Sequence, residues 1–253
     1  MPRSSDIDVS KITPKGVWMK VIEFQEGESF DIELEEDLLR RNEEIATANR
    51  ELLEQHRILA IDVMGSIGSG KTTLIERLSI RLGESAAVGV VAGDLTTTID
   101  AERIEERGAL VVEVNTGKEC HLDANLVGKA LRALDMEKLD LLFIENVGNL
   151  ICPAEFPLGA QRRLVIISVT EGPYMVVKHP HIFRGADVVA INKVELAAAM
   201  KVDPEKLRRD VLTINPAAKV VKTSLVADQG TAEVIEALGL TAWTRTGSSD
   251  SNA

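Results

Sequence analysis

The chain has 253 residues, a length that a single α/β domain with one core accounts for. Its formal net charge of −11 at pH 7 argues against a nucleic-acid-binding surface, which needs clustered Lys and Arg, and no apolar run approaches the roughly 18 residues that cross a bilayer. The start is polar rather than a secretory signal, and the two cysteines suit a protein whose thiols stay reduced, so we expect a cytoplasmic protein with no nucleic-acid or membrane partner.

Residues 1–57 are predicted to form an extension that precedes the domain. Val17–Phe24 alternates weakly between apolar and polar side chains, which predicts a short strand. Glu35–His56 is rich in charge, with leucines and isoleucines at intervals, which predicts a surface helix. We expect this helix to pack along the domain, and a docking arm for another protein is the alternative interpretation.

From residue 58 to residue 243 the pattern changes to short apolar runs separated by helical stretches, which predicts one domain. The near-continuous Val, Ile and Leu of these runs indicates strands covered on both faces. Such alternation predicts an α/β fold with a mostly parallel, doubly wound sheet flanked by helices. The predicted strands are Ile58–Met64, Val88–Ala92, Leu110–Val114, Leu139–Ile144, Leu164–Val169, Asp187–Ile191 and Ala218–Val221. Helices are expected near Ile99–Arg107, Asp123–Leu134, Pro204–Leu212 and Thr231–Leu238.

Three segments do not fit this pattern of strands and helices. Asp62 lies inside the first predicted strand, where a carboxylate needs a partner that the sequence does not identify. His179-Pro180-His181 is predicted to be a loop. Thr244–Ala253 lacks apolar residues apart from its final alanine and is predicted to be disordered.

The segment Gly65-Ser66-Ile67-Gly68-Ser69-Gly70-Lys71-Thr72 fits the phosphate-loop pattern GxxxxGK[ST]. It follows a predicted strand directly, and apolar residues continue after it with helical spacing as far as Leu82. The glycines let backbone N–H groups close around phosphate oxygens, Lys71 reaches the β- and γ-phosphates, and the Thr72 hydroxyl can hold Mg²⁺. We therefore predict a P-loop NTPase in which this segment and Thr73 bind the nucleotide.

Two carboxylates follow strands at the edge of the sheet where the phosphate loop is expected, since ligands gather at the carboxyl ends of parallel strands. Asp94 comes after the second predicted strand and Glu145 after the fourth. Either can hold Mg²⁺ together with Thr72, and helix capping is the alternative role for Asp94. No general base stands out, so we expect slow catalysis by positioning and charge stabilisation through Lys71, Asp94 and Glu145.

Two further strand ends resemble elements that G proteins use. Glu145-Asn146-Val147-Gly148 resembles DxxG with glutamate in place of aspartate, and Gly148 lets a backbone N–H approach the γ-phosphate. Asn192-Lys193-Val194-Glu195 resembles NKxD, whose carboxylate accepts hydrogen bonds from the guanine N1–H and exocyclic amine. Glu195 carries the same chemistry on a longer stem, so guanine is the predicted base. Ser224 follows the last predicted strand and can offer a backbone N–H to the guanine oxygen, with a plain loop as the alternative.

Cysteine and histidine residues gather in two of the predicted loops. Cys120-His121 lies before a predicted helix, a position that favours the metal-binding thiolate. Cys152 lies in the loop after Glu145, and Pro153 favours an extended backbone for it. Two thiolates and an imidazole suit Zn²⁺ or Ni²⁺, with two ordinary cysteines and a surface histidine as the alternative. Because three ligands do not complete a closed four-ligand site, we predict that two chains pool their cysteines around one ion.

The chain resembles the HypB family over roughly Ile58 to Leu240. The motifs that carry the resemblance are Asn115-Thr116-Gly117-Lys118-Glu119-Cys120-His121-Leu122-Asp123-Ala124 and Glu145-Asn146-Val147-Gly148-Asn149-Leu150-Ile151-Cys152-Pro153. The resemblance implies a P-loop GTPase for hydrogenase nickel insertion, a homodimer formed with GTP, and the cofactors GTP or GDP, Mg²⁺, and Ni²⁺ or Zn²⁺. The implied interface metal ligands are Cys120, His121 and Cys152. The chain has neither the N-terminal Cys-x-x-Cys-Gly-Cys motif nor the histidine-rich store of some family members.

The resemblance also implies partners, namely the zinc protein HypA and the hydrogenase large subunit, with the segment before Ile58 as a docking arm for HypA. The predicted function is a GTP-hydrolysing nickel metallochaperone. The presence or absence of the γ-phosphate is expected to change the Cys120 and Cys152 loops through Glu145–Gly148, so that the metal is released after hydrolysis. One alternative is the related urease nickel GTPase, whose Cys-Pro-His motif differs from Cys152-Pro153-Ala154. The others are a metal storage or sensing protein with a structural nucleotide, and a small-molecule kinase.

Overall fold

The computed structural model describes residues 29–83, 85–93, 109–114 and 121–242. The predicted strand at Val17–Phe24, the helix near Ile99–Arg107 and the tail Thr244–Ala253 lie outside these residues, and so do Asp94 and Cys120. Contacts divide the chain into residues 1–40 and residues 41–253, and the sheet belongs wholly to the second unit.

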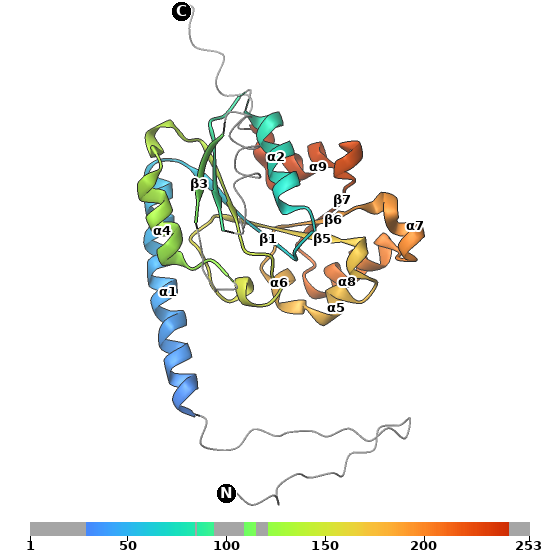
Figure 1. Ribbon diagram of the computed structural model, residues 1–253, viewed down its shortest axis with the longest axis horizontal. Coiled ribbons are helices and arrows are strands. Elements are labelled where there is room, and N and C mark those ends of the chain that lie inside the picture. Colours follow the sequence, from blue (N-terminus) through green and yellow to red (C-terminus); the bar gives the residue numbers. More distant parts are fainter. Residues whose placement is uncertain (1–28, 84, 94–108, 115–120, 243–253) are drawn as a thin grey trace, which may run out of the picture. The chain divides into compact units, whose positions relative to one another are not determined.

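Seven parallel strands form one sheet in the order β3-β2-β4-β1-β5-β6-β7 (Figure 1). The strands are β1 (Leu59–Gly65), β2 (Val88–Ala92), β3 (Leu110–Glu113), β4 (Leu141–Glu145), β5 (Arg162–Ser168), β6 (Val188–Asn192) and β7 (Lys219–Lys222). The predicted parallel, doubly wound sheet is therefore confirmed. Because β2, β3 and β4 lie on one side of β1 and β5, β6 and β7 lie on the other, the carboxyl end of β1 is the switch point at which such sheets bind ligands.

Helices follow most of the strands. They are α1 (Ser29–Gln55), α2 (Lys71–Leu82), α4 (Ala124–Ala133), α5 (Met175–Lys178), α6 (Pro180–Arg184), α7 (Ala197–Met200), α8 (Pro204–Ile214) and α9 (Thr231–Leu238). The predicted loop at His179–His181 is wrong, because Pro180 opens α6. Proline suits the first helical position, since its fixed φ matches a helix and its missing N–H would have no partner there. Among the described helices, none combines the length and apolar character that crossing a bilayer requires.

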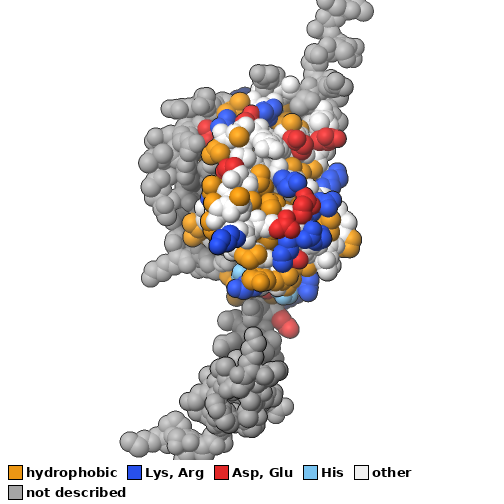
Figure 2. Space-filling model, turned by 90° about the vertical axis from the view of Figure 1, so that its right-hand side faces the viewer, with side chains coloured by type: hydrophobic (Ala, Val, Ile, Leu, Met, Phe, Trp, Pro, Cys, Tyr) orange, Lys and Arg blue, Asp and Glu red, His pale blue; other side chains and the backbone are white. Residues whose placement is uncertain are grey.

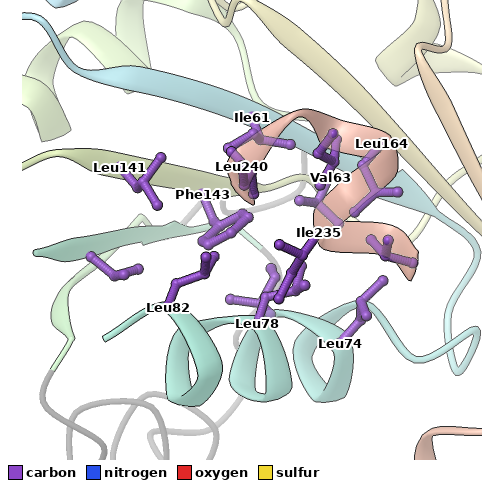
Figure 3. Close-up of a cluster of buried hydrophobic side chains, with 14 of the residues drawn as sticks. Ile61, Val63, Leu74, Leu78, Leu82, Leu141, Phe143, Leu164, Ile235 and Leu240 are labelled. Carbon is purple, nitrogen blue, oxygen red and sulfur yellow. The ribbon is translucent and has the colours of Figure 1, made fainter. Parts of the chain in front are cut away.

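One face of the sheet is covered by α2 and α9. Leu74, Leu78 and Leu82, which repeat every four residues along α2, point toward Val63 and Phe143 of the sheet (Figure 3). Their side chains are fully buried in this cluster. The helix that begins at the phosphate loop is thus fixed to the sheet along its whole length, which holds the loop before it in place.

The opposite face is covered by two groups of helices. Phe183 of α6 packs with Ile167 of β5, in a cluster to which α5 and α8 also contribute. Leu131 of α4 and Leu53 of α1 pack with Ile144 of β4. Successive residues of a strand point to opposite faces, so the central strands are apolar on both sides, as their near-continuous apolar runs predicted.

Charged side chains of both signs lie next to one another on the face that carries α7 and α8 (Figure 2). Exposed ion pairs of α8 include Arg209 with Asp203 at 3.2 Å, and Glu205 with Lys222 at 2.7 Å. Solvent and salt screen exposed pairs of this kind, so each contributes little to stability. The buried clusters rather than these pairs therefore account for most of the stability of the fold.

Candidate functional site

The phosphate loop joins β1 to α2 and is enclosed by β5 and β6. Gly65, Gly68 and Gly70 have φ angles of 155°, 73° and 109°, which side chains rarely adopt. A Cβ atom on Gly65 would lie 2.2 Å from the Ile166 carbonyl oxygen, and one on Gly70 would lie 2.5 Å from Asn192 Nδ2. The loop therefore needs glycine at these two positions, and it presents the unpaired N–H groups at the start of α2 to an anion.

A cavity of about 390 Å³ opens against this loop. It is lined by Gly68, Gly70, Lys71, Thr72, Thr73, Glu145, Asn192, Lys193, Glu195, Leu225 and Val226. All of these except Leu225 and Val226 belong to the predicted nucleotide and Mg²⁺ sites, so the structure brings those residues together. Val226 is 81% exposed, and the two apolar residues that follow Ser224 were the available signal for this part of the cavity wall.

Thr72 and Glu145 meet at one side of the cavity. Glu145 is the last residue of β4 rather than the first residue after it, and it is only 2% exposed. The Thr72 hydroxyl donates to Glu145 Oε1 over 2.7 Å. A hydroxyl and a carboxylate in contact at the start of a helix are hard oxygen donors, which suit Mg²⁺ bound together with phosphates.

The segment after β6 holds the phosphate loop from the other side. Asn192 Nδ2 donates to the Ser69 carbonyl oxygen at 2.8 Å, and Lys193 Nζ donates to the Gly68 carbonyl oxygen at 2.7 Å. Lys193 has a φ of 60°, in the left-handed region, and Glu195 is exposed at the rim of the cavity. The resemblance to NKxD indicated base recognition, but it did not indicate these contacts with the loop.

Lys71 and Ser224 each make contacts that a ligand would compete with. Lys71 Nζ donates to the carbonyl oxygens of Gly65 at 3.4 Å and Ser66 at 3.3 Å, which are long for such bonds. The Ser224 N–H donates to the Gln229 carbonyl oxygen at 3.1 Å, and Ser224 does not line the cavity. The Ser224 hydroxyl is buried and makes no hydrogen bond within the described part of the chain.

Asn146 connects the nucleotide cavity to a second loop. Its side chain is fully buried, and its Oδ1 accepts hydrogen bonds from the N–H groups of Leu122 at 3.1 Å and Val147 at 3.0 Å. Leu122 directly follows His121. A side chain one position after Glu145 therefore holds the backbone of the predicted metal loop. Asn146 entered the sequence analysis only as part of a motif, and no local pattern indicated this contact.

The segment that contains Asn146 also touches the phosphate loop. Asn149 forms an isolated antiparallel bridge with Gly65, the first residue of that loop. Gly148 does not line the cavity, and it lies between Asn149 and the Asn146 contacts. Residues 145–149 thus run from the Thr72 contact, past the predicted metal loop, to the start of the phosphate loop.

Asp62, whose partner the sequence did not identify, is the second partner of Asn146. Asn146 Nδ2 donates to Asp62 Oδ1 at 3.4 Å, and Arg163 Nε lies 4.0 Å from the Asp62 carboxylate. The carboxyl group is only 3% exposed. Burial raises the pKa of Asp62 from 3.8 to about 7, although Arg163 and Asn146 act in the opposite direction.

The two predicted metal loops lie close together. The ring centroid of His121 is 3.9 Å from that of Phe156, four residues after Cys152. Cys152 opens a 3-10 turn, Cys152–Ala154, so the extended backbone predicted from Pro153 is wrong. Proline is tolerated in such a first turn because its missing N–H would be unpaired there. Within the described residues, no three His, Cys, Asp or Glu side chains gather closely enough to hold a metal ion, and Cys120 lies outside those residues.

Helix α1 braces both of these loops. Asn49 Nδ2 donates to the carbonyl oxygens of Ala124 at 2.7 Å and Leu158 at 3.2 Å, so one side chain spans the two loops. Asn42 repeats the arrangement, because its Oδ1 accepts from the Ala124 N–H and its Nδ2 donates to the Pro157 carbonyl oxygen, each at 2.8 Å.

The fold and the site define a P-loop nucleotide-binding protein. Residues 59–222 match the family of CobW/HypB/UreG nucleotide-binding domains. The chain is 50% identical over 205 residues to the probable hydrogenase maturation factor HypB of Methanocaldococcus jannaschii, a match that covers 81% of this chain and 93% of the relative. The chain belongs to the HypB family of hydrogenase maturation factors, which confirms the resemblance seen in its motifs.

Two solved structures have the same fold. The structure of HypB from Archaeoglobus fulgidus is similar with a TM-score of 0.75 and 46% sequence identity, over 79% of this chain and 98% of that chain. The structure of HypB from Helicobacter pylori in complex with nickel is similar with a TM-score of 0.74 and 32% identity, over 84% of this chain and all of that chain.

Proposed function

We propose that this chain is a GTP-hydrolysing metallochaperone that carries Ni²⁺ or Zn²⁺ on Cys120, His121 and Cys152 and assists nickel insertion into a [NiFe]-hydrogenase. The metal would be shared at the interface of a GTP-dependent homodimer, with a HypA-like chaperone and the hydrogenase large subunit as further partners. The nickel complex of the Helicobacter pylori relative supports nickel as the cargo. The observation that carries the proposal is Asn146, whose hydrogen bond to Leu122 joins the nucleotide cavity to the loop of His121.

In this proposal, nucleotide binding uses the residues that line the cavity. Phosphate oxygens replace the long carbonyl contacts of Lys71 and accept from the N–H groups at the start of α2. Thr72 and Glu145 hold Mg²⁺, and Asp94 is a further predicted ligand; the bound ion neutralises charge on the phosphate oxygens. Asn192 and Glu195 contact the guanine, whose flat face packs against the apolar residues at 225 and 226.

Coupling in this proposal depends on residues 145–149. While the γ-phosphate is bound, the Gly148 N–H contacts it and the segment is held in place. Loss of that phosphate frees the segment, and Asn146 transmits the change to the Leu122 backbone and so to the loop of Cys120 and His121. Segments that order around a γ-phosphate and loosen after hydrolysis are a common type of switch.

Lys71→Ala tests the proposed function, with Lys129→Ala as a matched control on the exposed surface of α4. We expect the Lys71 variant to lose at least about 100-fold in GTP hydrolysis, because a charge aimed at the reacting phosphates is removed. Nickel delivery to the hydrogenase should fail with it, while the Lys129 variant behaves as wild type. Intact nickel delivery without hydrolysis would contradict the proposal and favour a passive metal store.

A further inference from the structure

A second cavity, of about 400 Å³, lies on the face of the sheet that α1 and α6 cover. Glu43 and Arg50 of α1 line it on one side, and Gly185 and Asp187, which follow α6, line it on another. The loop at residues 157–161 and the first two residues of β5 complete the wall. Among the described residues, none lines both this cavity and the nucleotide cavity. The two cavities are therefore separate.

The most buried charged side chains of this second cavity are Asp62 and Arg163. They lie side by side, because β1 and β5 pair in register at these two residues. Asp62 Oδ1 accepts from Asn146, whereas Asp62 Oδ2 makes no hydrogen bond within the described part of the chain. Arg163 Nε lies 4.0 Å from Oδ2, which is too far for a hydrogen bond. A buried acceptor and a largely buried donor thus lack partners at one cavity, and such groups are costly to leave unsatisfied.

The remaining charges of the wall are exposed. Arg162 lies 3.9 Å from Asp187, and Arg50 lies 3.4 Å from Glu54, so these arginines already have carboxylates nearby. The charged residues that line the cavity are three arginines and three carboxylates, namely Glu43, Arg50, Asp62, Arg162, Arg163 and Asp187. Their formal charges cancel, although the whole chain carries −11. A small anion is therefore not repelled from this cavity as it would be from most of the surface.

We propose that this cavity binds hydrogen phosphate between Asp62 and Arg163. A ligand there must accept hydrogen bonds from a guanidinium and donate one to a carboxylate oxygen. Hydrogen phosphate does both, because its unprotonated oxygens match the two-pronged geometry of arginine and its single O–H donates to Asp62 Oδ2. No covalent bond changes, and the anion and its proton bind and leave together.

The ionised Asp62 carboxylate makes the site selective. Sulfate has the same tetrahedral shape but no O–H, so it would place an oxygen lone pair against the carboxylate. A phosphate monoester loses its last proton at about pH 6 and is excluded at pH 8 for the same reason. Free hydrogen phosphate keeps its O–H at that pH. The inferred ligand is therefore free phosphate rather than a phosphorylated metabolite.

Binding at this cavity also has a route to the site described above. Asp62 Oδ1 accepts from Asn146 Nδ2, and Asn146 Oδ1 accepts from the Leu122 N–H. A ligand that fixes the Asp62 carboxylate thus fixes the side chain that holds the loop of His121. Phosphate binding itself does not depend on the proposed function.

An amide chemical-shift titration with inorganic phosphate at pH 8 tests this inference. The full chain is first saturated with a nonhydrolysable GTP analogue and Mg²⁺, so that the phosphate loop is filled. Gly159 and Gly185 line the second cavity, whereas Gly68 and Gly70 line the nucleotide cavity, so the signals that move locate the anion. Asp62 is ionised at pH 8, because burial raises its pKa only to about 7. We expect phosphate to shift the Gly159 and Gly185 signals, with an affinity at least about tenfold higher than that of sulfate or glycerol 3-phosphate.

Two variants assign the roles of the two side chains. Arg163→Gln removes the guanidinium and should weaken phosphate binding at least about tenfold. Arg132→Gln, on the exposed surface of α4, is the matched control and should bind phosphate as wild type does. Asp62→Asn replaces the ionised acceptor with an amide that can donate, so sulfate should then bind about as well as phosphate.

Equal affinity of wild type for phosphate and sulfate, or for phosphate and glycerol 3-phosphate, would overturn the inference. Shifts confined to Gly68 and Gly70 would also overturn it, because the anion would then occupy only the phosphate loop. Each of these results comes from wild type, so the test stands even if a variant does not fold. A chain that does not bind the GTP analogue would contradict the proposed function, whereas selective shifts of Gly159 and Gly185 with phosphate would still support this second site.

Discussion

At the scale of single residues, Asp62 shows how a polar side chain that interrupts an apolar strand can support the site above it. It lies three residues before Gly65, and its partners are Asn146 and Arg163. Burial of the carboxylate is unfavourable, yet an apolar residue would leave the Asn146 amide without its acceptor. We infer that Asp62 orients Asn146, which in turn holds Leu122.

The raised pKa of Asp62 predicts how stability changes with pH. Because the pKa rises from 3.8 to about 7 on folding, the folded chain binds more protons than the unfolded chain between these values. The contribution of Asp62 to the free energy of unfolding is therefore fully present below pH 3.8 and is lost as pH rises to about 7. Asp62→Asn removes this dependence, so its stability relative to wild type should increase between pH 5 and pH 8, by at most about 4 kcal/mol.

Urea unfolding across this pH range measures the difference. Glu236→Gln, an exposed change on α9, is the control and should follow wild type at every pH. A difference between Asp62→Asn and wild type that stays constant with pH would show that the carboxyl group does not titrate in this window.

Candidate site residues can be predicted from the sequence where a residue type and a local spacing define the chemistry. Lys71, Thr72 and Glu145 were predicted in this way, and the structure brings them to one cavity. The role of Asn146 was not predicted, because it depends on how strands align. Asn146 reaches Leu122 only because β4 lies between β1 and β2.

At the scale of elements, the second half of α1 does more than cover the sheet. The charge pattern predicted a surface helix, and asparagines in such a pattern are expected at the surface. Asn42 and Asn49 are buried instead, and they bond to both loops of the predicted metal site. These contacts could not be predicted, because the loops they join are more than 70 residues away in the sequence.

Asn49→Ala tests this bracing role. The change leaves the Ala124 and Leu158 carbonyl oxygens without their donor, which should lower the free energy of unfolding by about 1–3 kcal/mol. Thr47→Ala, two residues earlier on the exposed side of the same helix, should change it by less than about 0.5 kcal/mol. Equal stability of the two variants in urea would mean that α1 does not brace the loops.

The strands and the helices with several turns were predicted, and the helices of four or five residues were not. The seven strands predicted between residues 58 and 243 agree with the observed ones to within two residues at each end, and α9 has the predicted bounds. The helices α5, α6 and α7 have only four or five residues each, too few for a helical repeat of apolar positions to appear. Packing against the neighbouring helices and strands, rather than a local pattern, determines these short helices.

At the scale of the whole molecule, the nucleotide cavity and the predicted metal loops use the same edge of one sheet. The carboxyl end of β4 supplies Glu145 to the cavity and Asn146 to the loop of His121, and the chain then continues to Cys152. A change at the nucleotide cavity can therefore affect the predicted metal loops through adjacent residues of one segment. With three predicted ligands per chain, a complete metal site would need a second chain or another ligand, so nucleotide state, assembly and metal affinity are expected to change together.

The coupling between nucleotide and metal through Asn146 is tested most directly by measuring the affinity for Ni²⁺ in wild type and in Asn146→Ala. Each protein is measured with GDP and with a nonhydrolysable GTP analogue. Asn125→Ala is the matched control, because Asn125 is an exposed asparagine of α4, outside residues 145–149. We predict that the two nucleotides change nickel affinity at least about fivefold in wild type and in the control, and less than about twofold in Asn146→Ala. A wild-type difference in Asn146→Ala, or no difference between the nucleotides in wild type, would contradict the account.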